Sequence, residues 1–258
     1  MVTEYISQAW KAYKRNLWDL IGAIIIMWII ILVPIAIAIV PVFVLLVGTV
    51  PLTGMDPQLF FQSFFSTLFT NIPVLIFSAI LFIIAMLLSI ALSAGFIKIT
   101  YDSLKGRARV DTMINVARKK FWTVIGANVF SFLIMAVLGF ALMFSFIAIS
   151  FLITSNTTFS TVMFLIGGII WFLMILLFFF VDHAIVIDNH MAIDSVKKSV
   201  KVASKNYVDL LALIIIFFLL MLVFAFIPFI GFVVINFIIS PVFILALTAL
   251  YVKKRRAR

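Results

Sequence analysis

Long apolar runs alternate with short basic stretches along the whole chain of 258 residues. All 19 lysine and arginine residues fall into four groups, within residues 11–15, 98–120, 197–205 and 253–258. Each apolar tract between these groups is long enough for two membrane crossings, because one spanning helix needs about 20 predominantly apolar residues. An even number of crossings places all four groups on one membrane face. We therefore expect a multi-pass protein of the cell membrane with both termini in the cytoplasm, the side on which lysine and arginine accumulate.

The apolar tracts predict an all-α fold with six transmembrane helices. We expect these helices at about residues 17–50, 72–100, 121–153, 162–187, 207–227 and 231–252. The first tract would form a helix about 50 Å long at about 1.5 Å per residue, which is too long for one straight crossing. Pro34 and Pro41 lie within it, and we expect them to bend or end the helix.

The connections on the far side of the membrane contain no lysine or arginine. The longest includes apolar residues at three- and four-residue spacing, which predicts a helix lying in the outer interface: Phe60, Phe61, Phe64, Phe65, Leu68 and Phe69. This helix either covers the end of the bundle or forms a docking surface for a protein partner. Asn156 begins an Asn-Thr-Thr tripeptide that fits the N-glycosylation pattern and falls on the same side.

Three segments that precede the first, third and fifth spans share one pattern of apolar positions. Spacings of three, one, three and four residues place five apolar or small residues on one side of a helix in each segment, within residues 6–17, 110–121 and 196–207. The match continues into the membrane, where Leu17–Ala23 aligns with Phe121–Ala127 and Tyr207–Leu213. We therefore expect one integral membrane domain, residues 1–258. It would be built as three parallel repeats of an amphipathic helix plus a transmembrane hairpin, at about residues 3–100, 107–187 and 193–252.

The basic faces of these three amphipathic helices point to membrane lipids as partners. The chain is 66% hydrophobic and 11% charged, whereas an ordinary soluble domain has about 25% charged residues. We attribute its formal charge of +10 to topology and to attraction by anionic head groups, and we expect no nucleic acid partner. The residues expected to contact lipid head groups are Lys11, Lys14, Arg15, Arg118, Lys119, Lys120, Lys197, Lys198, Lys201 and Lys205.

Motifs for catalysis, phosphate binding and metal binding are missing from the sequence. The chain has no cysteine, which excludes disulfides, thiolate metal sites and thiol catalysis, and it has only two histidines. We therefore expect a protein that is not an enzyme and has no cofactor and no metal site. The N-terminal residues lack the pattern of a removable signal peptide.

The most unusual polar pair is Asp182-His183, at the end of the fourth span. Ionisable groups at membrane depth are rare and are candidates for function. One interpretation is a polar collar at the cytoplasmic interface, paired with nearby lysine. The other is a proton or ion site facing the bundle interior, to which Asn128 and Asn236 would contribute.

Three further stretches carry a resemblance to a known family. They are a DSLKG turn at residues 102–106, the run AIVIDNHMAIDSVKKSVKVASKNYVDLL at residues 184–211, and SPVFILALTALY at residues 240–251. Together they resemble an uncharacterised family of integral membrane proteins related to the membrane domain fused to some bacterial glycerophosphodiester phosphodiesterases. Members often have a proline near the position of Asp182, where this chain departs. The resemblance implies a six-helix membrane module, without phosphodiesterase activity.

Two functional hypotheses follow from the sequence. The first is a non-enzymatic membrane module that acts as a scaffold, an accessory subunit or a lipid-interacting protein. The second is a small secondary transporter or channel that uses polar residues near Asp182 and His183.

Overall fold

The computed structural model describes residues 2–49, 57–153 and 157–255. Every regular element in these ranges is helical, so the predicted all-α fold is confirmed. Six helices in the same ranges are long and apolar enough to cross a membrane, which marks the chain as a multi-pass membrane protein. They are Leu17–Leu45, Ile72–Leu104, Val110–Ile149, Thr161–Ile187, Tyr207–Ala225 and Ile230–Lys254.

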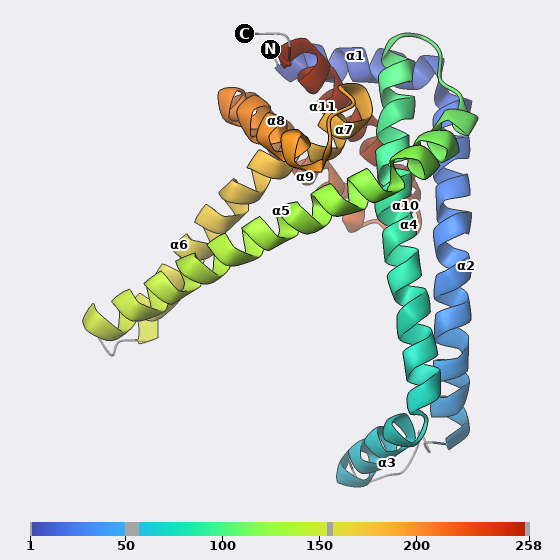
Figure 1. The fold of residues 1–258 in the computed structure, drawn as a ribbon, viewed down its shortest axis with the longest axis vertical. Coiled ribbons are helices and arrows are strands. Elements are labelled where there is room, and N and C mark those ends of the chain that lie inside the picture. Colours follow the sequence, from blue (N-terminus) through green and yellow to red (C-terminus); the bar gives the residue numbers. More distant parts are fainter. Residues whose placement is uncertain (1, 50–56, 154–156, 256–258) are drawn as a thin grey trace.

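The first membrane hairpin consists of α2 (Leu17–Thr49) and α4 (Ile72–Leu104), which pack side by side (Figure 1). The helix α1 (Val2–Arg15) crosses one end of this hairpin, and α3 (Pro57–Thr70) lies at the other end, where the sequence predicts a helix. Pro34 and Pro41 both lie inside α2, so neither of them ends the helix.

The second hairpin consists of α5 (Val110–Ile153) and α6 (Thr157–Ile175). Near its start α5 packs on α4, where Gly95 lies so close to the backbone of Met113 that a Cβ atom would overlap it. From there the hairpin diverges from α2 and α4 (Figure 1). After α6, a 3-10 helix (Leu176–Phe178) and a turn lead into α7 (Val181–Ile187).

The last part of the chain begins with α8 (Ala192–Lys205) and α9 (Tyr207–Ala225). A tight break follows, with Phe229 at a φ of 59° and Gly231 packed against the carbonyl of Phe224. The chain then returns through α10 (Ile230–Val234), a π-helix (Ile235–Ile239) and α11 (Ser240–Lys254). Both termini lie at the same end of the molecule (Figure 1).

The hydrophobic core lies at this end, which carries the termini. Its largest fully buried side chains include Tyr5 of α1, Leu245 and Tyr251 of α11, and Phe180 in the turn before α7. Farther along the hairpins many large apolar side chains are exposed, such as Phe144 at 71%. In a membrane these side chains face lipid, whose hydrocarbon is as apolar as they are.

Two asparagines mark the turns between an amphipathic helix and the span that follows. The Asn16 side chain donates a hydrogen bond to the carbonyl of Ala12, and that of Asn206 donates one to Val202, at 3.0 and 2.8 Å. The aligned position in the second unit is Lys120, and α5 continues through it without a break. The expected boundary between a surface helix and a span at residue 121 is therefore not found. Lysine is a good helix former and lacks an amide that could close the preceding turn.

Aligned positions of the three units have closely similar exposure. Trp18, Trp122 and Val208 are each 79–80% exposed. The residues two and five positions farther on are fully buried in all three units: Leu20, Val124 and Leu210, then Ala23, Ala127 and Leu213. This agreement is what a repeat predicts. The threefold repeat itself stays a prediction.

Candidate functional site

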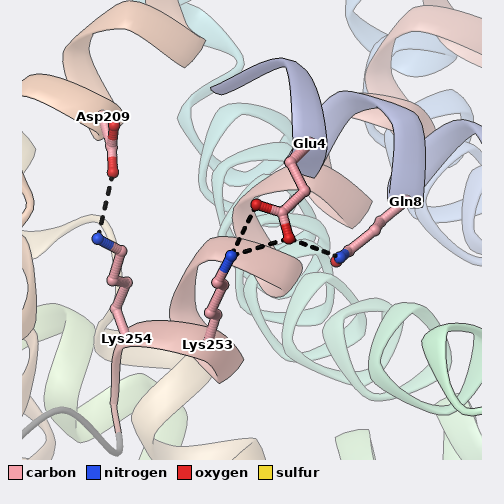
Figure 2. Close-up of polar contacts among 5 residues, drawn as sticks. All are labelled: Glu4, Gln8, Asp209, Lys253 and Lys254. Atoms are coloured by element: carbon pink, nitrogen blue, oxygen red, sulfur yellow. Dashed lines mark hydrogen bonds and ion pairs between the residues drawn. The ribbon is translucent and has the colours of Figure 1, made fainter. Parts of the chain in front are cut away.

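Residues at the C-terminal end of α11 form ion pairs with several other elements. Lys253 donates to the carboxylate of Glu4 in α1 at 2.7 Å, and Lys254 lies 3.4 Å from Asp209 at the start of α9 (Figure 2). Arg255 pairs with Asp188, which follows α7. The Lys253 ammonium, through its hydrogen bonds and its charge, holds the pKa of Glu4 below the usual value. These cations therefore connect elements of the protein to one another.

The ten cations expected to contact lipid head groups differ from this set, because none of them forms an ion pair within the described residues. They lie on α1, on the first turns of α5 and on α8, and all of them are exposed except Lys120 and Lys198, which are half-buried. Lys120 donates to Asn189, and Lys198 donates to the carbonyl of Arg255 at 3.4 Å. The exposed members are Lys11, Lys14, Arg15, Arg118, Lys119, Lys197, Lys201 and Lys205. We call these ten residues the unpaired basic surface.

A hollow of about 400 Å³ adjoins this surface between α1, α4 and α11. Its lining includes Lys11, Arg15 and Lys253, together with Glu4 and Gln8. Arg15 also donates to the carbonyl of Ser103 at 2.6 Å, which fixes its guanidinium at the end of α4. The hollow thus combines two cations of the unpaired basic surface with the Lys253–Glu4 pair.

The polar residues predicted inside the membrane separate into three places. Asn128 of α5 donates to Asp182 of α7 at 2.9 Å, so the structure brings this pair together. Asp182 forms no ion pair in the part of the chain that the structure describes, and the lysine expected beside it is not found there. Asn236 donates to the carbonyl of Phe232 in its own segment at 2.8 Å, apart from the other residues.

His183 faces a different set of residues from its neighbour Asp182. Its Nε2 lies 3.3 Å from the hydroxyl of Thr248, which lies 2.9 Å from the hydroxyl of Thr100. Nδ1 of His183 is buried and has no hydrogen-bond partner among the described residues. A buried donor without a partner costs about 1–3 kcal/mol. With the proton on Nε2, His183 donates to Thr248 and the unpaired Nδ1 is an acceptor, whereas the other tautomer would bury an unpaired N–H donor.

Sequence reasoning missed Thr100 and Thr248, and also Ser131, which is buried on α5 with an unpartnered hydroxyl. Each is a single small polar residue in an apolar span, and α4 and α11 lie far apart in sequence. Nothing in one sequence marks such residues as partners. Within the described ranges, histidine and acidic side chains form no group that could hold a metal ion.

Comparison with known proteins gives one family. Residues 39–254, which is most of the chain, match the family described as Domain of unknown function (DUF7847). The chain belongs to this family. No curated protein and no solved structure matches it. Nothing in the DUF7847 match links the chain to the membrane domain of glycerophosphodiester phosphodiesterases, so that resemblance stays a prediction.

Proposed function

We propose that this DUF7847 protein is a non-enzymatic membrane module that binds anionic lipid head groups and acts as a scaffold or accessory subunit. The observation that carries the proposal is the contrast between two sets of cations. Lys98, Lys253, Lys254 and Arg255 are used in ion pairs within the protein. The unpaired basic surface has no acidic partner in the described ranges, so its charge is available to other molecules.

Membrane lipid is the partner that this placement favours. The cations lie on amphipathic helices whose opposite sides are buried on the spans, as Ala9 on α1 and Ala203 on α8 illustrate. Cations held next to a bilayer attract its anionic lipids, with about 1 kcal/mol for each lysine or arginine near the surface. We propose that this surface is cytoplasmic, that both termini lie on that side, and that the resemblance to the phosphodiesterase-associated membrane module reflects a shared architecture.

The test compares two double variants with the same loss of charge. Lys197→Gln with Lys201→Gln removes two exposed, unpaired cations from α8. Lys253→Gln with Lys254→Gln removes two cations that form ion pairs. We expect the first variant to reduce copurified anionic lipid, measured by lipid mass spectrometry, without loss of thermal stability. We expect the second to reduce lipid less and to lower stability. Equal lipid losses in the two variants would contradict the proposal.

A second candidate function, a proton- or cation-coupled transporter or channel, is favoured by the Asn128–Asp182 pair. A carboxylate without a cationic partner at membrane depth is unusual, because charged groups there are normally paired or line a water-filled path. The test is Asp182→Asn, with ion or proton flux measured in proteoliposomes. Loss of a flux that the unaltered chain supports would favour transport over the lipid-binding module. If the protein is instead the lipid-binding module, the Asp182→Asn variant keeps its fold and its anionic lipid content.

A further inference from the structure

We propose that a cleft between α5 and α6 binds one acyl chain of a membrane lipid that carries a free hydroxyl group. The cleft has a volume of about 800 Å³ and runs along α5 from Asn128 to Ile147. Both helices are candidate membrane spans, so the medium around the cleft is lipid. This inference goes beyond the proposed function, because it does not involve the unpaired basic surface.

The cleft is long enough to hold an extended hydrocarbon chain. The distance along α5 from Asn128 to Ile147 is about 28 Å at about 1.5 Å per residue, close to the roughly 30 Å thickness of a bilayer core. The lining along this length is almost entirely apolar and includes Phe140, Met143 and Phe164. A lipid chain is the apolar molecule that a membrane supplies in this form.

Three glycines shape the walls of the cleft. A Cβ atom at Gly139 would lie 2.8 Å from the indole nitrogen of Trp171, and one at Gly167 would lie 2.7 Å from the ring of Phe146. These two glycines therefore allow α5 and α6 to approach closely. Gly168 also lines the cleft, but nothing lies within 4 Å of a Cβ built there. The open space beside Gly168 is part of the room available to a ligand.

One end of the cleft is polar, and its unused groups can receive a hydroxyl. Ser131 is 9% exposed, and its buried hydroxyl has no partner among the described residues. The amide nitrogen of Asn128 donates to Val124 and to Asp182, which leaves the amide oxygen as an acceptor. A hydroxyl can donate to the Asn128 oxygen and also bond to Ser131. Removing a hydroxyl group from water costs less free energy than removing a charged ammonium group.

The first test fills the cleft. The full chain in nanodiscs is photolabelled with a monoacylglycerol that carries a diazirine on its acyl chain, and labelled residues are located by mass spectrometry. Gly168→Trp places a large side chain in the open space of the cleft, whereas Ile169→Trp adds the same side chain at a neighbouring position that is 60% exposed and does not line it. We expect Gly168→Trp to reduce labelling of Phe140, Met143 and Phe164 severalfold and Ile169→Trp to leave it unchanged. Equal labelling of cleft and outward-facing residues in the unaltered chain would overturn the proposal.

The second test concerns the hydroxyl group. A fatty acid methyl ester with the same diazirine chain has no hydrogen-bond donor and serves as the comparison probe. Because hydrogen bonds to Asn128 and Ser131 favour the hydroxyl, we expect the monoacylglycerol to label the cleft about fivefold more than the ester. Ser131→Ala should reduce this preference while labelling by the ester stays unchanged. Equal labelling by the two probes in the unaltered chain would refute hydroxyl recognition. Neither result depends on anionic lipid, so failure here is distinguishable from failure of the proposed function.

Discussion

Replacing Thr248 with valine removes one hydroxyl from the centre of a buried polar chain and changes the volume of the side chain very little. In the structure this hydroxyl contacts Nε2 of His183 on α7 and the hydroxyl of Thr100 on α4, at 3.3 and 2.9 Å. Thr100 in turn donates to the carbonyl of Ile97. The variant therefore removes both contacts that Thr248 makes with α7 and α4, and it leaves the Nε2–H of His183 without this acceptor.

The loss of stability follows from these two links. Hydrogen bonds between helices within membranes contribute about 0.6 kcal/mol on average and at most about 1.7 kcal/mol. Two links therefore give an expected loss of about 1–3 kcal/mol in the free energy of unfolding. Full burial of Thr100 and Thr248 places the effect in the upper part of this range, since water cannot replace the lost partners.

The assay is unfolding of the full chain in mixed micelles with increasing sodium dodecyl sulfate, followed by far-ultraviolet circular dichroism. Thr248→Ser keeps the hydroxyl and should retain most of the stability. Thr70→Val serves as a second control, because Thr70 is exposed and its hydroxyl donates to the carbonyl of Ser66 in its own helix. If Thr248→Val were as stable as the unaltered chain, the polar chain would not hold these helices together and the assigned tautomer of His183 would lose its basis.

Two further predictions concern packing and topology. Gly95→Ala should lower the stability by about 1–3 kcal/mol, because the added methyl group overlaps the backbone of Met113 where α4 and α5 cross. Gly168→Ala, at an open position, should be close to neutral in the same unfolding assay, and equal effects of the two would contradict this crossing. For topology, single cysteines in this cysteine-free chain should divide into two classes toward an impermeant thiol reagent. Cysteines at Thr53, Asn156 and Phe229 should react from outside the cell, whereas those at Lys105, Lys198 and Lys254 should react only after permeabilisation. Labelling of position 105 from outside would mean that the first apolar tract crosses the membrane an odd number of times.

The sequence predicts the membrane helices well, because the signal for each is long and continuous. The spans that begin at Ile72 and Tyr207 start where the apolar tracts indicate. The helix over residues 57–70 is also found, and the sequence predicts it because its aromatic residues recur at helical spacing. For the spans, the local sequence is enough to predict a helix, because a spanning segment must satisfy its backbone hydrogen bonds within itself.

Contacts between distant segments could not be predicted in the same way. The Asn128–Asp182 bond joins residues 54 positions apart, and the Thr100–Thr248 contact joins residues 148 positions apart. Which polar side chains meet depends on how the hairpins pack, and apolar helices in lipid offer many alternative packings. The direction of His183, toward Thr248 and away from Asp182, is likewise a consequence of packing. Adjacent residues on a helix point about 100° apart, so a polar pair in sequence need not form one site.

The second of the three aligned units is where the chain departs from its own pattern, and it is also where the candidate polar site lies. The first and third units have asparagine turns at Asn16 and Asn206, whereas α5 continues through Lys120 into the diverging hairpin of Figure 1. In the alignment, the positions of Asn128 and Ser131 carry only apolar residues in the other units: Ile24 and Met27 in the first, Ile214 and Phe217 in the third. Polar residues inside a span weaken its partition into lipid, so a packing role shared by all three units would not favour them in one unit alone. Asn128 and Ser131 thus occur together in the unit with a continuous α5, where both line the cleft between α5 and α6. This points to a function specific to that unit, which both the lipid cleft and the transport alternative would use.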